Sequence, residues 1–313
     1  MIVRDRPSGF KLFLILRGSI LPRILPTLAF NVLVAILVTL THGDLFALKI
    51  TLTPIPFSLI GLPLAIFLGF RNTAAYDRYW EARKLWGELV IRTRNLARQC
   101  QNLIAGPQPV HASRGLDDVR VRMVYRAIAF AHALKQQLRP DATQADMKEW
   151  LQPFEAQQLA RASNKPNFLL SKMGADLRLC LEEKRIDPCL AVNVDDSISG
   201  MTAAAAACER IKHTPIPFSY TLLLHRTAYL YCFLLPFGLV DSIGFMTPFV
   251  VGIVAYTFFG LDALGDEIEE PFGTEPNDLP LDAICRTIEI DMREALADEH
   301  VPTPLLPVGY CIK

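Results

Sequence analysis

The sequence predicts an all-α membrane protein in which four apolar segments cross a bilayer and a bundle of helices lies in water. Hydrophobic residues make up 51% of the 313 residues and the mean hydropathy is +0.26, which is too apolar for an ordinary soluble domain. Charged residues still make up 20%, so a sizeable part of the chain must lie in water. Neither an alternating strand pattern nor an internal repeat is present in the sequence.

The four apolar segments come in two pairs. They cover residues 25–41 and 54–70, then 227–240 and 244–264. A spanning helix needs ~20 apolar residues, so the first two segments are at the short limit. The third must extend back through the stretch that holds His225 and Arg226. An ionisable pair at that depth has to face protein or water rather than lipid, and we interpret His225 as a histidine packed at a helix interface.

Positive charge lies on one side of these segments. The links between paired segments hold almost none, whereas the opposite ends carry Arg4, Arg6, Lys11, Arg17 and Arg23, and then Arg71, Arg78, Arg83, Lys84, Arg92, Arg94 and Arg98. The positive-inside rule therefore predicts that both termini and the long middle section lie in the cytoplasm.

The middle section, residues 71–213, is helical in pattern, and the second apolar segment is expected to continue into it without stopping. Breaks are predicted at "AGPQP", "RPDA", "NKPN" and "IDPC", and Thr143 followed by Asp146 predicts a helix start. The predicted organisation is an N-terminal arm with two membrane helices (1–70), a cytosolic helical insertion (71–213), two further membrane helices (214–264) and an acidic segment with a C-terminal helix or tail (265–313).

Enzyme chemistry finds little support in the sequence. No GxGxxG, Walker A, HExxH or GxSxG motif is present, and the six histidines are isolated. The seven cysteines form no CxxC pair, which argues against a disulfide framework or a zinc site. A net charge of zero argues against nucleic acid as a partner. The remaining classes are a pore, a transporter and a membrane-anchored scaffold, and no inverted repeat supports the transporter.

Two stretches carry the candidate sites. In the second apolar segment, Leu62, Ile66 and Phe70 follow one another at four-residue spacing on one helix face. In a symmetric oligomer they would form three apolar rings that can gate by dewetting, although any stripe of a spanning helix looks apolar. The second stretch, "EIEEPFGTEPNDLPLD" at 267–282, has six carboxylates and no Lys or Arg. It is either a cation site or a set of acids that cap helices and pair with the basic arm.

Five separated stretches resemble the bestrophin family, bacterial branch. They are "LRGSI" at 16–20, "LPLAIFLGF" at 62–70, "IDPCL" at 186–190, "IPFSYT" at 216–221 and "EEPFGTEPNDLP" at 269–280. They keep the family's order and cover nearly the whole chain. The resemblance implies a homopentameric ion channel with one central pore, located in the bacterial inner membrane and embedded in its lipid bilayer. Such a channel is expected to conduct small monovalent ions and to require no cofactor.

The resemblance also assigns the sites. Leu62, Ile66 and Phe70 occupy the pore neck, and Cys189 occupies the cytosolic aperture, with Ile186 as the fallback. The acidic stretch matches the family's calcium clasp, where the ligands would be the side chains of Glu267, Glu275 and Asp278 and the carbonyl of Glu270. Pro276 and Asn277 interrupt the run of acids that the eukaryotic clasp has, so Ca²⁺ is only a possible ligand.

Selectivity stays open between cations such as sodium and anions such as chloride, because an apolar neck does not choose the sign of the ion. The acidic content near the expected inner mouth lacks a local basic balance in the sequence. We therefore expect a cation-permeable channel slightly ahead of a chloride channel of the same architecture.

Overall fold

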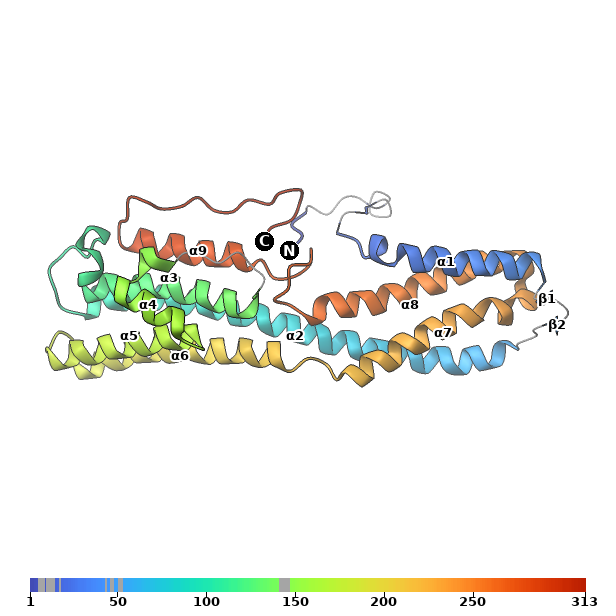
Figure 1. Ribbon diagram of the computed structural model, residues 1–313, viewed down its shortest axis with the longest axis horizontal. Helices are drawn as coiled ribbons and strands as arrows, with labels where there is room; N and C mark the ends of the chain where they lie inside the picture. Colours follow the sequence, from blue (N-terminus) through green and yellow to red (C-terminus); the bar gives the residue numbers. More distant parts are fainter. Residues whose placement is uncertain are drawn as a thin grey trace.

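The computed structural model describes residues 1–4, 9, 15–16, 18–42, 44–45, 48–49, 53–140 and 147–313. The molecule is elongated, with one half built from four helices and the other from a larger bundle (Figure 1). Its helices are α1 (Leu21–Leu40), α2 (Pro54–Leu103), α3 (Val119–Leu138), α4 (Pro153–Arg161), α5 (Lys165–Glu182), α6 (Pro188–His213), α7 (Phe218–Ile243), α8 (Thr247–Glu269) and α9 (Leu281–Ala295). Short 3-10 turns are η2 (Ala112–Asp117), η3 (Met147–Trp150) and η4 (Gly244–Met246).

The membrane half contains α1, the first part of α2, α7 and α8, which pack against one another (Figure 1). Three stretches of described helix are long and apolar enough to cross a membrane, namely Leu21–Leu40, Pro54–Leu103 and Phe218–Glu269. The third stretch is a hairpin, because the chain turns at Gly244, whose φ of +50° suits glycine. The third predicted segment is longer than its apolar run and starts at Phe218, as its His225–Arg226 extension required.

The four helices of the membrane half pack around small and apolar side chains. Leu64 and Leu68 on α2 meet Ala228 and Cys232 on α7. A Cβ at Gly238 would overlap the ring of Phe57, so α2 and α7 approach closely where α7 carries glycine. Small residues at such contacts are typical of membrane helices, since packing rather than water exclusion holds them together.

Helix α2 joins the two halves without a break, as the sequence predicts. It has 50 residues, which corresponds to about 75 Å of helix. In the second half its inward face buries Trp86, Leu89 and Leu96 in the large core. One continuous helix therefore connects the membrane half to the second half.

The second half surrounds α3, which is buried on nearly every side. Helices α2, α5, α6 and α9 pack on it or on each other. The predicted breaks are confirmed: α2 ends at Leu103 and α3 at Leu138, while Asn164 and Asp187 cap the starts of α5 and α6. The predicted start at Thr143–Asp146 lies outside the described residues, as do Arg6, Lys11 and Arg17.

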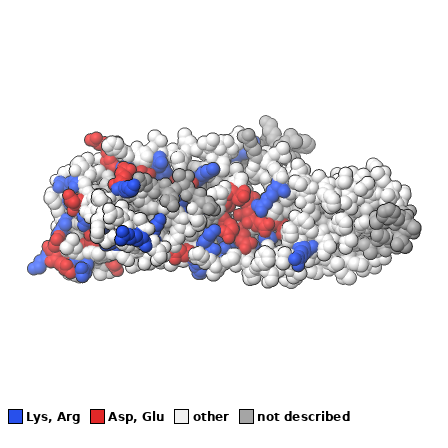
Figure 2. Space-filling model, in the orientation of Figure 1, with Lys and Arg blue, Asp and Glu red and all other residues white. Residues whose placement is uncertain are grey.

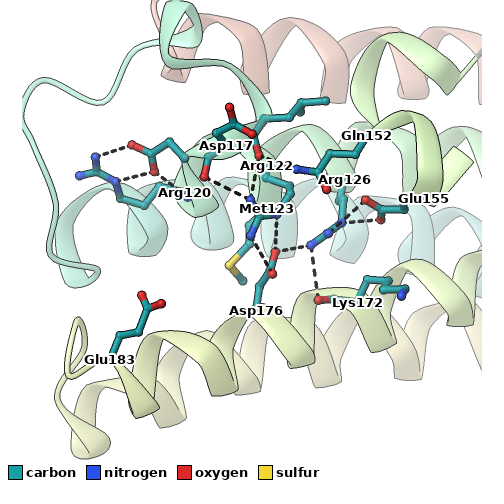
Figure 3. Close-up of polar contacts among 12 residues, drawn as sticks. Asp117, Arg120, Arg122, Met123, Arg126, Gln152, Glu155, Lys172, Asp176 and Glu183 are labelled. Atoms are coloured by element: carbon teal, nitrogen blue, oxygen red, sulfur yellow. Dashed lines mark hydrogen bonds and ion pairs between the residues drawn. The ribbon is translucent and has the colours of Figure 1, made fainter.

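A buried ion network ties α3 to α4 and α5 (Figure 3). The guanidinium of Arg126 lies 2.6 Å from Glu155 and also pairs with Asp176. Arg122 donates two hydrogen bonds of 2.9 Å to the two carboxylate oxygens of Asp176. Because buried charges need partners and hydrogen bonds, this network fixes how the three helices dock.

Both chain ends lie at the same place in the second half, beside α9 (Figure 1). The N-terminal ammonium of Met1 donates to the carbonyl of Ile312 at 2.6 Å, and Val3 N donates to Tyr310 O at 2.8 Å. Strands β1 (Asp44–Leu45) and β2 (Leu48–Lys49) form a two-residue antiparallel pair at the tip of the membrane half (Figure 1). This pair is too short to give an alternating pattern, which is why the sequence did not predict it.

Candidate functional site

The predicted neck residues form one exposed line on the outer face of α2. Leu62, Ile66 and Phe70 are 67%, 47% and 61% exposed in the single chain. Leu64 and Leu68 point the other way and are buried in the membrane half. The apolar side chains of α2 therefore lie on two faces. One face packs against other helices of the same chain, and the other is exposed in the single chain.

The exposed face of α2 changes character immediately after the neck. Thr73, Asp77, Trp80 and Lys84 continue the line into the second half and are exposed. The predicted neck is thus the last continuous apolar part of a face that, Trp80 apart, becomes polar and charged beyond Phe70. Such a change is expected where a helix leaves the bilayer.

Arg71, the residue after Phe70, is buried rather than part of a basic surface. Its guanidinium donates to Asp262 Oδ1 on α8 at 2.8 Å, pairs with Asp266 and lies 3.5 Å from Glu269. Sequence reasoning missed this role and counted Arg71 among the cytoplasmic cations. The available signal was the spacing of the three acids, at four and then three residues, which puts them on one face of α8.

His225 joins the same cluster from α7. Its Nδ1 lies 2.7 Å from Asp262 Oδ2, and its ring packs on Tyr229 with centroids 4.2 Å apart. Asp262 therefore bridges Arg71 on α2 and His225 on α7. The position of His225 at a helix interface agrees with the sequence interpretation.

The acidic stretch and its neighbours have local basic partners. Arg78 donates to the carbonyl of Glu269 at 3.2 Å, Lys212 lies 3.2 Å from Glu270, and Lys135 lies 2.7 Å from Asp282. Figure 2 shows acidic residues with basic ones beside them at the border of the uncharged membrane half. The expectation of unbalanced acidity at this border is wrong, because the balancing cations come from distant parts of the sequence.

The predicted clasp residues satisfy one another. Asn277 donates to Glu267 Oε1 at 2.9 Å, Glu275 N donates to Asp278 Oδ2 at 2.7 Å, and the carbonyl of Glu270 accepts from Gly273 N at 3.0 Å. A calcium ion needs about six to eight oxygens. Within the described ranges, no group of three or more His, Cys, Asp or Glu side chains is placed to hold a metal, and the clasp stays a prediction.

Asp278 is the most unusual member of the stretch. Its side chain is buried and its Oδ1 has no hydrogen-bond partner in the described part of the chain. Burial raises the pKa of Asp278 from its ordinary 3.8 to about 6, against the hydrogen bond from Glu275 N and the charge of Arg139, which lower it. This carboxyl can therefore change its charge near neutral pH.

The two aperture candidates lie in different environments. Cys189 is exposed at the start of α6, at the end of the second half furthest from the membrane half (Figure 1). Ile186 is buried in the large core. Of the two, only Cys189 is exposed to solvent in the single chain.

Two curated relatives match nearly the full chain. A voltage-dependent anion channel-forming protein of Mesorhizobium japonicum is 44% identical over 98% of this chain and 95% of its own length. The voltage-dependent anion channel-forming protein YneE of Escherichia coli is 40% identical over 98% of both chains. These names indicate an ion channel rather than an enzyme, and they favour the anion alternative over the cation-permeable reading of the sequence.

Solved structures and a family model agree with this likeness. A bacterial bestrophin homolog from Klebsiella pneumoniae has a TM-score of 0.80 and 38% identity, and it covers 88% of this chain and 99% of its own. The model of the family described as "Bacterial/Fungal Bestrophin protein" matches residues 1–294. The chain therefore belongs to the bestrophin family, in its bacterial and fungal branch.

Proposed function

We propose that the chain is the subunit of a homopentameric channel that passes small monovalent anions through an apolar neck formed by Leu62, Ile66 and Phe70. The observation that carries the proposal is the exposed face of α2, which is apolar along these three residues and polar beyond them. A ring of subunits that turned this face to a common axis would place an apolar constriction directly before a hydrated vestibule. Such constrictions can gate by dewetting.

The topology follows from the helices and the charges. Helices α1, α7, α8 and the start of α2 would each cross the bacterial inner membrane. The second half and both termini would lie in the cytoplasm, in line with the positive-inside rule and with the pairing of Met1 and Ile312 at the two chain ends. The cytosolic aperture would be lined by Cys189, which is exposed at the far end of α6.

An anion pathway is supported by the names of the relatives and by the local pairing of the acids at the membrane border. The prediction of sodium permeation depended on acidic residues near the inner mouth that had no basic partners nearby in the sequence. The structure removes that reason, because the guanidinium of Arg71 and the ammonium of Lys212 pair with carboxylates of this region.

Reversal potential is the decisive measurement. Purified protein is reconstituted into a planar bilayer with a tenfold NaCl gradient, and the current is measured as a function of voltage. A reversal potential near the chloride equilibrium potential supports the anion pathway, whereas one near the sodium equilibrium potential overturns it. Absence of current, with the NaCl gradient applied in either direction, would favour a membrane-anchored scaffold.

A further inference from the structure

An apolar groove opens between α1 and α7 in the membrane half, close to the charged border. Its volume is about 430 Å³, within the usual range of ligand pockets of roughly 300–1,000 Å³. Phe30 on α1, Leu230 and Phe233 on α7, and Phe259 on α8 line it. Phe30, Leu230 and Phe233 are exposed in the chain, so the groove is open to whatever surrounds the membrane half.

The end of the groove nearest the border carries a cation without a partner. Arg226 lines the groove and is exposed, and it has no hydrogen bond or ion pair within the ranges that the structure describes. Two other arginines near this border do have acidic partners: Arg71 is buried against three acids, and Arg23 lies 4.0 Å from Asp266. An unpaired guanidinium on a membrane helix is costly unless it meets water or a counter-charge, and guanidinium groups bind phosphate in a bidentate way.

A second polar group without a partner lies deeper in the groove. Asn31 on α1 is only 3% exposed, and its Oδ1 has no hydrogen-bond partner among the residues that the structure describes. A buried amide left without a partner costs roughly 1–3 kcal/mol. A ligand that fills the groove and brings a hydroxyl or an ester oxygen to Asn31 would remove that cost.

We propose that this groove binds one anionic phospholipid. The phosphate lies at Arg226, the glycerol–ester region reaches Asn31, and an acyl chain lies along Phe30, Leu230 and Phe233. Charge complementarity decides for an anionic headgroup, because no acid in the described part of the chain neutralises Arg226. Basic pockets between membrane helices on the cytoplasmic side are known to take such headgroups.

The groove is connected to the neck through a short chain of contacts. His225, next to Arg226, lies 2.7 Å from Asp262, and Asp262 lies 2.8 Å from Arg71, which directly follows Phe70. A phosphate at Arg226 would act on this cluster electrostatically. This consequence rests on the proposed function, and on that basis lipid occupancy changes ion flux.

Native mass spectrometry tests the binding. The full-length protein in detergent is titrated with dioleoylphosphatidylglycerol or with dioleoylphosphatidylcholine, whose acyl chains are identical. We expect phosphatidylglycerol to bind more tightly, Arg226→Gln to weaken it about tenfold, and Arg226→Lys to retain most of the affinity. The matched control is Arg98→Gln, which removes another exposed arginine of the second half and should leave lipid binding unchanged.

Further measurements distinguish the apolar part of the groove from the phosphate site at Arg226. Phe233→Ala should weaken both lipids and keep the preference for phosphatidylglycerol, while soluble glycerol phosphate should not displace the lipid. Equal affinity for the two lipids, or an unchanged preference in Arg226→Gln, overturns the proposal. Displacement by glycerol phosphate would mark a headgroup site without a lipid, and dissociation of the oligomer by Arg226→Gln with no lipid bound in wild type would mark a subunit contact. Either result also overturns it.

Flux measurements stand apart from the binding test. In liposomes of phosphatidylcholine with and without phosphatidylglycerol, wild-type flux should depend on the anionic lipid and Arg226→Gln flux should not. Binding without an effect on flux overturns the connection to the neck. Lipid binding in a protein that shows no flux in any liposome would instead overturn the proposed channel function and leave the lipid site standing.

Discussion

Asp262 Oδ1 on α8 lies 2.8 Å from Arg71 Nη1 on α2, and the two side chains are at most 4% exposed. The residues are separated by 191 positions in the sequence. Asp262 also contacts His225 on α7 at 2.7 Å, so one carboxylate joins three of the four helices of the membrane half. Because Arg71 follows Phe70 directly, this cluster holds in place the part of α2 that carries the predicted neck residues.

Removing the cation of this cluster should strongly destabilise the protein. Arg71→Met leaves Asp262 buried without its main partner, and breaking a buried pair in this way costs about 3–5 kcal/mol. Arg94→Met is the control, because it breaks a more exposed pair with Asp291 at 2.8 Å and should cost less than about 1 kcal/mol. The free energy of unfolding of the detergent-solubilised protein measures both changes. Equal effects of the two substitutions would show that Arg71 does not anchor the helices.

Shortening a neck side chain should raise ion flux. Ile66→Ala widens the middle ring and lowers the apolar barrier to hydration, so we expect severalfold more flux from liposomes. The control is Phe249→Ala, which shortens an exposed apolar side chain of the membrane half on α8 and should not change flux. If both variants behave like wild type, the three residues do not form the constriction.

Cys189 gives a chemical test of the aperture. Five of the other cysteines are buried and Cys311 is half-buried, so a water-soluble thiol reagent should reach Cys189 first. A reagent that attaches a sulfonate should reduce anion flux, because the added negative charge repels the ion. Cys189→Ser should abolish the effect and Cys311→Ser should not. Modification of Cys189 without any change in flux would remove this residue from the pathway.

The sequence predicted those features that depend on local pattern. Hydropathy predicted α1, the start of α2 and α8, and the breaks at "NKPN" and "IDPC" predicted the starts of α5 and α6. Hydropathy alone did not reveal the start of α7, because His225 and Arg226 interrupt its apolar run. No local sequence pattern indicates that Asp262 pairs with His225. The same limit applies to the charge balance at the border, since Lys212 and Glu270 meet across 58 positions. Such pairings are properties of the fold and cannot be read from one sequence.

The calcium clasp stays a prediction that calorimetry can test. Asp278 Oδ1 has no hydrogen-bond partner among the described residues, whereas Asp278 Oδ2 and Glu267 Oε1 already accept from Glu275 N and Asn277, so a Ca²⁺ ion that used all of these oxygens would compete with the bonds that order the loop. The clasp prediction expects heat on titration of Ca²⁺ into wild type and none with Asp278→Ala. If titration of wild type gives no heat, the calcium interpretation is wrong. Asp282→Ala, which lies outside the predicted ligand set, is the control for a nonspecific loss of structure.

Asp278 should make the protein more stable as the pH falls from neutral. Its pKa in the folded state, about 6, lies above its ordinary 3.8 because the carboxyl is buried. The folded protein therefore binds the proton more tightly than the unfolded chain between these values. The penalty of the buried charge is present above pH 6 and is relieved as the pH falls through 6 toward 4.

The size of this effect can be isolated by difference. Between pH 7.5 and 5, Asp278 should contribute roughly 1 kcal/mol of added stability in wild type, and Asp278→Asn should lack that contribution. His132, whose pKa is lowered to about 4 by burial, titrates in both proteins and cancels in the comparison. Asp282→Asn is the matched control. Burial is the largest single effect on Asp282 and raises its pKa, but the hydrogen bond from Lys135 and the charges of Lys135 and Arg139 together lower it below its ordinary value. Asp282 is then ionised throughout this window, so its loss should cost the same at both pH values. If the free energy of unfolding changes with pH in the same way in wild type and in Asp278→Asn, burial does not destabilise the charged form of Asp278.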